Sequence, residues 1–238
     1  MSSNLPAAEE FRAVSSETCV VIPAYQAEST IGPLVEAVRR QGLEVIVVDD
    51  ASPDATAEKA GKAGASVIVR SSNGGKGVAL RQGLEQACRG RFHWFLTMDA
   101  DGQHLAREIP LFLREAASGH ADIIIGNRMR NPRGMPFLRF ATNRFMSWLL
   151  SRITHQNVPD TQCGFRIVSR AVLEKVELSA DRFEIDSEFV VKAAWAGFRI
   201  VFISVSSVYR REPSFIRPFR DTVRFFRFIR SLKRPPDS

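Results

Sequence analysis

The chain has 238 residues, of which 45% are hydrophobic, and a formal net charge of +7. This length suits one large domain with an appendage, and the hydrophobic share is enough for a substantial core. No apolar run approaches the roughly 18–20 residues that span a bilayer. Residues 1–17 are polar and acidic, without the apolar segment of a signal peptide. A membrane-spanning or secreted protein is therefore not expected.

The predicted elements alternate between strand and helix along the chain. Apolar runs predict strands at residues 19–23, 45–48, 67–69, 94–98, 123–125 and 199–205. Helical spacing and capping residues predict helices at residues 30–41, from Ser52-Pro53 onward, and at 78–88, 106–117, 136–151 and 186–196. Residues 160–166 are predicted to form a polar turn. The pattern indicates an α/β fold with a mostly parallel sheet and helices on both faces.

The two ends of the chain differ from this pattern. Residues 1–16 are expected to be a disordered lead, followed by a main domain at residues 17–211. Residues 212–238 form a basic extension, since residues 210–234 hold nine basic and two acidic side chains and leave the remainder neutral. Such a local charge predicts an anionic partner, either a membrane or nucleic acid.

Three cysteines are spread widely along the chain. Cys19, Cys88 and Cys163 form no CxxC motif. The pattern favours reduced thiols in a cytosolic protein over disulfides or a zinc site. For Cys163, packing is favoured over a nucleophilic role.

Polar motifs follow several predicted strands: residues 24–26, Asp49-Asp50, residues 99–101 and residues 126–128. Ligands of such sheets bind beyond the carboxyl ends of the strands, so these loops are expected to form one site. Asp99 and Asp101 could turn toward one point and hold a divalent cation that also carries phosphate oxygens. His104 could line this site, and Arg128 suits an anion.

The segment Asn73-Gly74-Gly75-Lys76-Gly77 departs from a phosphate loop, because Gly77 stands where that motif has Ser or Thr. Two interpretations remain. The segment is either a tight turn that opens a helix or a flexible loop beside a diphosphate.

Together these motifs resemble the GT-A glycosyltransferases of family 2, and most closely the branch that glycosylates dolichol phosphate and other polyprenyl phosphates. The resemblance runs from about residue 18 to about residue 211, in order and at similar spacing. The segments that carry it are residues 21–25, 47–54, 75–77, 98–104, 125–128, 136–139 and 164–166. It implies a Rossmann-like GT-A catalytic domain at residues 17–211.

The resemblance also implies roles for individual residues. Asp99, Asp101 and Gln103 should hold Mg²⁺ or Mn²⁺ on the donor diphosphate. Arg128, Arg139 and Arg210 should contact phosphates of donor or acceptor, and Asp101, Arg128 and Arg139 are the candidate catalytic residues. The implied nucleotide-sugar site comprises Pro23, Ala24, Tyr25, Glu28, Val48, Asp50, Lys76, Asp99, Ala100, Asp101 and Arg210.

Two positions depart from the family pattern. The family has Tyr-Asn-Glu where this chain has Tyr25-Gln26-Ala27, and Glu28 is the candidate replacement for the missing carboxylate. The family's Gly-x-Ser-Lys is replaced by residues 211–215. The first departure leaves the base and sugar open, with GDP-mannose and UDP-hexoses as the candidate donors.

The expected reaction is inverting attack by a lipid phosphate on the anomeric carbon of a nucleotide sugar. A phosphate is already ionised at pH 7 and requires no strong base. The first alternative is a family 2 transferase acting on a lipid or saccharide hydroxyl, with Asp160 or Glu188 as base. The second is a non-catalytic lipid- or nucleic-acid-binding Rossmann-like protein. The paired carboxylates disfavour nucleic acid as a partner.

Residues 215–234 are predicted to form an amphipathic helix. Its apolar positions, including Phe215, Phe219 and Phe226, follow helical spacing, and arginines follow the same period on another face. Such a helix can lie in an anionic membrane interface or pack on the domain. The membrane interpretation places the protein in the cytoplasm, peripherally on the inner face of the membrane.

Overall fold

One mixed sheet organises the residues that the computed structural model describes, which are 5–130, 132, 135, 137–206 and 229–230. The strand order is β3-β2-β1-β4-β6-β5-β7. In chain order the strands are β1 Thr18–Ala24, β2 Glu44–Asp49, β3 Ser66–Val69, β4 Trp94–Thr97, β5 Ile123–Asn127, β6 Arg166–Ser169 and β7 Ile200–Ser204. Strand β6 runs antiparallel to β4 and β5, and the other neighbouring pairs are parallel. The predicted α/β class with a mostly parallel sheet is confirmed.

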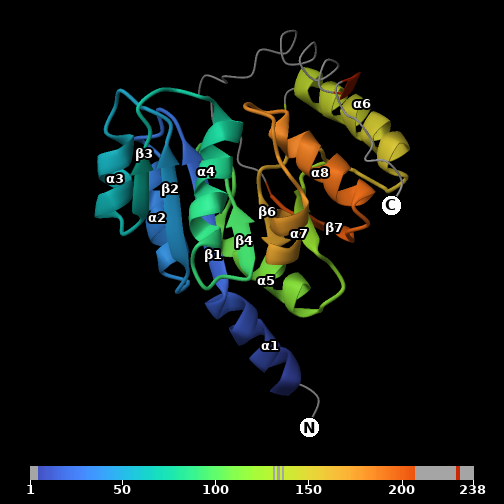
Figure 1. Ribbon diagram of the computed structural model, residues 1–238, viewed down its shortest axis with the longest axis horizontal. Helices are drawn as coiled ribbons and strands as arrows, with labels where there is room; N and C mark the ends of the chain where they lie inside the picture. The colour runs from blue at the N-terminus through green and yellow to red at the C-terminus, as the bar shows by residue number, and fades with distance from the viewer. Residues whose placement is uncertain (1–4, 131, 133–134, 136, 207–228, 231–238) are drawn as a thin grey trace.

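Helices connect and cover the strands. They are α1 Leu5–Ser16, α2 Ile31–Arg39, α3 Thr56–Lys62, α4 Lys76–Cys88, α5 Ile109–Ala117, α6 Phe137–Thr154, α7 Arg170–Lys175 and α8 Ile185–Trp195, with a 3₁₀ turn at Ala106–Glu108 before α5. Helix α4 crosses in front of β1 and β2, and α8 lies beside α6 and contacts β7 (Figure 1). Within the described ranges, no helix combines the length and apolarity needed to cross a bilayer.

The strands are buried because helices cover them. Every residue of β1 is buried, as is every residue of β5 and all of β2 after Glu44. Continuous apolar strands of this kind are typical of a parallel sheet covered on both faces. The three cysteines are free thiols. Cys19 and Cys163 are buried in the core, in agreement with the prediction of buried, reduced thiols.

The order of the strands has a switch point between β1 and β4. From β1 the chain moves to β2 and β3 on one side and then returns to β4 on the other. The connections therefore leave β1 and β4 in opposite directions, and in sheets of this kind ligands bind at the carboxyl ends of the strands at such a point. Tyr25 follows β1 at this point, and Asp99 lies two residues after β4.

The N-terminal segment differs from the prediction. We expected residues 1–16 to be disordered, but Leu5–Ser16 forms α1, which contacts α5 and extends from the lower end of the sheet in Figure 1. Val14 is 9% exposed, and its carbonyl oxygen accepts the Thr18 hydroxyl at 2.6 Å. The expectation of disorder is therefore wrong for Leu5–Ser16, because α1 buries part of one face.

Two local predictions also need correction. Ser52-Pro53 does not begin a helix, because the Ser52 hydroxyl donates to Asp49 and accepts the Gln26 N–H; α3 begins at Thr56, whose N–H donates to Asp54 at 3.1 Å. The polar turn at residues 160–166 leads directly into β6, a strand that we did not predict. The predicted amphipathic C-terminal helix falls on residues 215–234, of which the structure describes only residues 229–230.

Candidate active site

The Asp-Ala-Asp segment lies where predicted, in the loop after β4. Met98 is fully buried and anchors this loop in the core. The Asp99 carboxylate accepts from the Lys76 ammonium at 2.7 Å and lies 3.4 Å from Nε2 of His104. The Asp101 carboxylate accepts the Gln103 N–H at 2.9 Å. The loop thus gathers two carboxylates beside one lysine.

The two carboxylates differ in their electrostatic surroundings. Burial opposes ionisation of Asp99, but the charges and hydrogen bonds of Lys76 and His104 together outweigh it and hold the pKa of Asp99 well below its usual range. Burial and the nearby charge of Asp99 raise the pKa of Asp101. Asp101 makes no ion pair with any described residue. The loop is therefore an anionic site that a further cation would stabilise.

A divalent cation fits this pair of carboxylates. Asp99, Asp101 and Gln103 supply only oxygen atoms, the ligand type that Mg²⁺ and Mn²⁺ prefer. Among the described residues, no group of three or more His, Cys, Asp or Glu side chains could hold a metal ion by itself. Two protein carboxylates leave coordination positions open, as in sites where substrate phosphates complete the shell.

The turn before β6 seats Asp99. A Cβ atom on Gly164 would lie 2.4 Å from both carboxylate oxygens of Asp99, so only glycine fits there. The Thr97 hydroxyl donates to the Gly164 carbonyl at 2.7 Å and ties this turn to β4. Next along the chain, Phe165 packs against His104 with ring centroids 5.2 Å apart. The motif Gly164-Phe165-Arg166 thus supports the loop that carries Asp99.

The glycine loop before α4 is held by internal hydrogen bonds. The Asp50 carboxylate accepts the Gly74 and Gly75 N–H groups at 2.9 and 2.7 Å. The Asp181 carbonyl accepts the N–H groups of Gly77 and Val78. These donors are used within the protein, which favours the tight-turn interpretation over a flexible phosphate loop. The Lys76 side chain is the part of this segment that reaches the candidate site.

Asp186 is a site residue that the sequence interpretation missed. Its carboxylate contacts the Lys76 ammonium at 2.7 Å and the Arg166 guanidinium at 2.9 Å. Both Asp186 and Arg166 are buried, at 4% and 1% exposure. One signal was available in the sequence. Asp186 lies in the first turn of a helix, Ile185–Trp195, most of whose residues are apolar, so a largely buried helix could be expected.

The predicted nucleotide residues lie together at the ends of β1 and β2. Pro23 pairs with Val48, and the Asp50 N–H donates to the Ala24 carbonyl at 2.8 Å. The side chain of Tyr25 is 38% exposed beside them. Asp50 is buried and forms an ion pair with Arg70 at 2.8 Å. Asp50 therefore shapes the loop, while Tyr25 offers a ring to solvent.

The other predicted residues of this site are placed as follows. Glu28 is exposed and pairs with Lys59 at 3.5 Å. Ala100 is 7% exposed, and its carbonyl accepts the Thr30 hydroxyl at 2.6 Å, which links the loop after β4 to the start of α2. Arg139 lies in the first turn of α6, but its side chain is outside the described residues, as is all of Arg210.

Arg128, which follows β5, forms a buried ion pair with Asp160. Its Nε and Nη2 atoms donate to the Asp160 carboxylate at 2.8 and 2.9 Å, and its side chain is 3% exposed. Asn143 also donates to Asp160 at 2.9 Å. The fork of Arg128 is thus engaged by a buried carboxylate, and it links the end of β5 to the turn before β6. A contact of Arg128 with phosphate stays a prediction.

The two candidate bases are also engaged. Burial disfavours ionisation of Asp160, but Arg128 outweighs it and lowers the pKa of Asp160 to about 2. The Glu188 carboxylate accepts from Ser179 and Ala180 N–H groups and pairs with Lys192 at 2.7 Å, and these contacts lower its pKa against the effect of burial. Neither carboxylate suits the role of general base, which works best with a pKa near the working pH.

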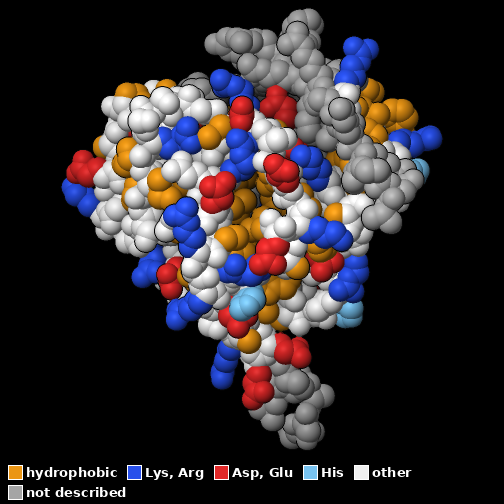
Figure 2. Space-filling view, in the orientation of Figure 1, with side chains coloured by type: hydrophobic (Ala, Val, Ile, Leu, Met, Phe, Trp, Pro, Cys, Tyr) orange, Lys and Arg blue, Asp and Glu red, His pale blue; other side chains and the backbone are white. Residues whose placement is uncertain are grey.

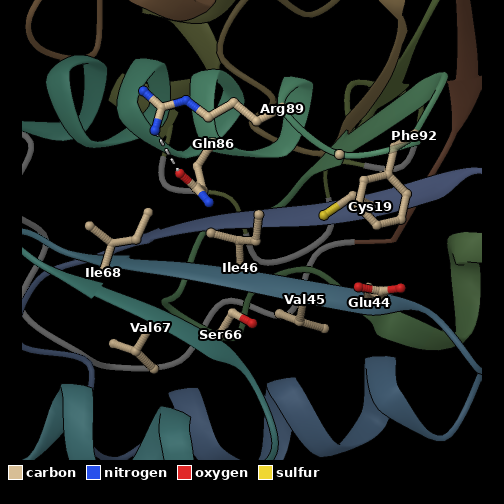
Figure 3. Close-up of a pocket in the computed structure, with 11 residues that line it drawn as sticks. Cys19, Glu44, Val45, Ile46, Ser66, Val67, Ile68, Gln86, Arg89 and Phe92 are labelled. Atoms are coloured by element: carbon tan, nitrogen blue, oxygen red, sulfur yellow. Dashed lines mark hydrogen bonds between the residues drawn. The ribbon is translucent and has the colours of Figure 1, made fainter.

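A separate pocket of about 420 Å³ lies at the other end of the sheet. It is lined by the first residues of β1, β2 and β3, among them Cys19, Glu44 and Ser66, and by the end of α4 (Figure 3). Figure 3 shows Gln86 of α4 and Arg89, which follows α4, above these strands. Because it lies at the amino ends of the strands, this pocket is distinct from the site around Asp99.

Known proteins resemble this chain in sequence. Residues 19–177 match Glycosyl transferase family 2. The undecaprenyl-phosphate mannosyltransferase of Micrococcus luteus is 32% identical over 80% of this chain and 83% of its own length. The dodecaprenyl-phosphate galacturonate synthase of Rhizobium johnstonii is 31% identical over 70% of this chain and 52% of its own length.

A solved structure shows the same fold. Glucosyl-3-phosphoglycerate synthase from Mycobacterium tuberculosis, in complex with Mn²⁺, uridine diphosphate and phosphoglyceric acid, superimposes with a TM-score of 0.72 at 18% identity. The match covers 93% of this chain and 78% of that one. The order β3-β2-β1-β4-β6-β5-β7 is thus the sheet of a GT-A glycosyltransferase. With the sequence match over residues 19–177, the chain belongs to glycosyltransferase family 2 and is a glycosyltransferase.

Proposed function

We propose that the protein transfers a hexosyl group from a nucleotide sugar, GDP-mannose or a UDP-hexose, to a polyprenyl phosphate. The observation that carries this proposal is that Asp99 and Asp101 both lie in the loop after β4, with the Lys76 ammonium 2.7 Å from the Asp99 carboxylate. Two carboxylates and one lysine are the charges needed to hold a metal-bound diphosphate. The names of the Micrococcus and Rhizobium relatives supply the class of acceptor.

The proposed donor site is built from residues at the carboxyl ends of β1, β2 and β4. Pro23, Ala24 and Tyr25 line the nucleoside, and Tyr25 offers its exposed ring to the base. Val48 and Asp50 form the floor beside them. Asp99, Asp101 and Gln103 hold Mg²⁺ or Mn²⁺, which when bound offsets the charge of the leaving diphosphate.

The engaged carboxylates favour a phosphate acceptor over a hydroxyl. A hydroxyl requires a base, and the carboxylate oxygens of Asp160 and Glu188 are engaged by cationic and hydrogen-bonding partners that lower their pKa and hence their basicity. A phosphate is ionised at pH 7, so the reaction depends on positioning and on charge stabilisation. Attack from the face opposite the leaving group inverts the anomeric carbon. Arg139 and Arg210 are the proposed phosphate contacts, since an arginine fork binds two oxygens at once.

A lipid acceptor requires a membrane-facing surface, and α6 offers one. Phe137, Leu138, Phe145 and Trp148 are exposed by 83%, 59%, 48% and 55%. Figure 2 shows hydrophobic surface in the upper right region, where α6 lies in Figure 1. Exposed aromatic and basic side chains on one helix suit a membrane interface. We propose that α6 and the basic residues 215–234 hold the protein on the cytoplasmic, inner face of an anionic membrane.

A product assay tests the proposal. Purified protein with Mn²⁺ is incubated with GDP-mannose, UDP-glucose or UDP-GlcNAc, and with either polyprenyl phosphate or phosphoglyceric acid as acceptor. We expect one donor to give a lipid-extractable product that mild acid hydrolyses. A product on phosphoglyceric acid alone, or on a lipid that carries a hydroxyl but no phosphate, would contradict the proposed acceptor.

A further inference from the structure

Lys76 lies between two carboxylates, only one of which also pairs with an arginine among the described residues. Its ammonium is 2.7 Å from Oδ1 of Asp99 and 2.7 Å from Oδ2 of Asp186, and its side chain is 13% exposed. Asp186 also has Arg166 at 2.9 Å. Asp99 has no arginine among the described residues. Lys76 is therefore the main cation for Asp99, whereas Asp186 keeps a second one.

The backbone of Lys76 is fixed, but its side chain can move. The N–H groups of Gly75 and Gly77 are held by Asp50 and by the Asp181 carbonyl. A Cβ atom on Gly77 would lie 2.2 Å from the Ala180 carbonyl oxygen, so the start of α4 is pressed against this loop. A lysine ammonium on a flexible stem can change partners without moving such a backbone.

The position of Lys76 conflicts with a metal ion on Asp99. A divalent cation bound by Asp99 would lie close to an ammonium that contacts the same carboxylate, and like charges at this range repel strongly. A diphosphate that arrives with the metal removes the conflict, because its oxygens offer the ammonium a new partner. Asp186, at 2.7 Å, can retain Lys76 during this exchange.

We propose that Lys76 is an internal cation that occupies Asp99 until a metal-bound diphosphate replaces it. The inference rests on the proposed metal-dependent donor site and adds a coupling to it. Metal alone binds weakly, because it must displace Lys76. Metal and diphosphate bind cooperatively, since each favours the state in which Lys76 has left Asp99.

The experiment measures Mn²⁺ affinity by the electron paramagnetic resonance signal of free Mn²⁺, first with Mn²⁺ alone. We expect Lys76→Met to bind Mn²⁺ about tenfold more tightly than the wild type, within the 5–150-fold range of typical couplings. Asp186→Asn should act in the opposite direction and bind Mn²⁺ several-fold more weakly, because it leaves Lys76 to Asp99. If Lys76→Met fails to fold by circular dichroism, Lys76→Gln replaces it.

The second measurement adds GDP or UDP, with a correction for Mn²⁺ bound by the nucleotide in buffer. The nucleotide that strengthens Mn²⁺ binding to the wild type should do so much less in Lys76→Met. Arg81→Met is the matched control, since Arg81 lies on the same helix and pairs with Asp181 at 2.7 Å. It should change Mn²⁺ affinity by less than about twofold, as expected for a partly exposed pair.

Three results would overturn the inference: unchanged or weaker Mn²⁺ binding by folded Lys76 variants, an equal gain in Arg81→Met, or absence of Mn²⁺ binding by the wild type with either nucleotide. The proposed acceptor fails separately. If the product assay gives no lipid product but Lys76→Met tightens Mn²⁺ binding, the coupling stands and the acceptor is wrong.

Discussion

Gly164 touches Asp99 so closely that the turn before β6 and the loop after β4 form one unit. A Cβ atom at position 164 would come within 2.4 Å of both Asp99 carboxylate oxygens. These residues are 65 positions apart, yet the shape of the candidate metal site depends on the absence of one methyl group.

Gly164→Ala should therefore damage the site more than the fold. The added methyl group must displace the Asp99 carboxylate, and overpacking of this kind costs about 1–3 kcal/mol of stability. We expect Mn²⁺ affinity and transfer each to fall at least about tenfold, because a displacement near 1 Å can cost more than that in rate. Gly32→Ala is the matched control, since its nearest neighbour would be the Lys59 carbonyl at 3.9 Å. Wild-type Mn²⁺ affinity in Gly164→Ala would contradict this account.

Asp101→Asn tests the metal assignment directly. The substitution keeps the acceptor for the Gln103 N–H but removes a charge that forms no ion pair with any described residue. Loss of a main electrostatic stabiliser typically costs about 10²–10³ in rate. We expect this loss in kcat at saturating Mn²⁺, with an unchanged melting temperature. Wild-type activity of the variant in EDTA would show that the metal assignment is wrong.

The Arg128–Asp160 pair should contribute to stability in a pH-dependent way. The pKa of Asp160 is lowered to about 2 from its model-compound value of 3.8. Its ionised form therefore stabilises the fold above the unfolded pKa, and this stabilisation is lost as pH falls from about 4 toward 2. The difference is worth about 2 kcal/mol.

Urea unfolding at several pH values checks this prediction. Asp160→Asn should lower the free energy of unfolding at pH 7 by about 3–5 kcal/mol, since it leaves Arg128 buried without its anion. The free energy of unfolding of the variant should also fall less between about pH 4 and pH 2 than that of the wild type, because the variant has no carboxylate at position 160 to protonate. Equal stability of the two proteins at pH 7 would mean that the pair is dispensable.

The acceptor assignment predicts different kinetic effects for two residues. Glu188→Gln should leave kcat within a few-fold of the wild type, because Glu188 binds the Ser179 loop and no substrate in our proposal. Arg139→Ala should instead raise the KM for polyprenyl phosphate by about tenfold or more, as expected for loss of a charged hydrogen bond. A large loss of kcat in folded Glu188→Gln would favour a hydroxyl acceptor.

Membrane attachment is tested by co-sedimentation with anionic liposomes. The full chain should bind them more strongly than a chain ending at Glu212, and salt should release it, because each basic residue near an anionic surface contributes about 1 kcal/mol. The exposed side chains of α6 remain in the shorter chain. Trp148→Ser in the full chain therefore tests how much α6 contributes to liposome binding. Equal, salt-insensitive binding of both chains would contradict an electrostatic anchor.

Much of the parallel half of the sheet could be predicted from sequence. Strands such as Ile123–Asn127 are continuous apolar runs, and the carboxylates after β4 follow directly from the strand end. Strand β6 was missed because it begins with an arginine and ends with a serine, which leaves only Ile167 and Val168 as an apolar run. That arginine is buried only because Asp186, 20 residues later, returns to pair with it.

In the candidate site, too, local features could be predicted and long-range contacts could not. Its motif residues could be identified, but their partners could not. Nothing local in the sequence says that Arg128 is paired with Asp160 rather than with a substrate, since the two are 32 residues apart. The same holds for Lys76 and Asp186, which are 110 residues apart. Long-range ion pairs decide which charges are available to a ligand, and they require the fold.

The placement of β6 also has a consequence for the order of folding. Strands β1 to β4 comprise residues 18–97 and pair among themselves, whereas β5 reaches β4 only through β6. During synthesis the first four strands can associate before residue 166 exists. Strand β5 cannot join them until β6 lies between β4 and β5, and pairings between distant residues form slowly. Gly164 arrives with β6. The Asp99 carboxylate therefore lacks this neighbour in the nascent chain and reaches its final position only when β6 has joined the sheet.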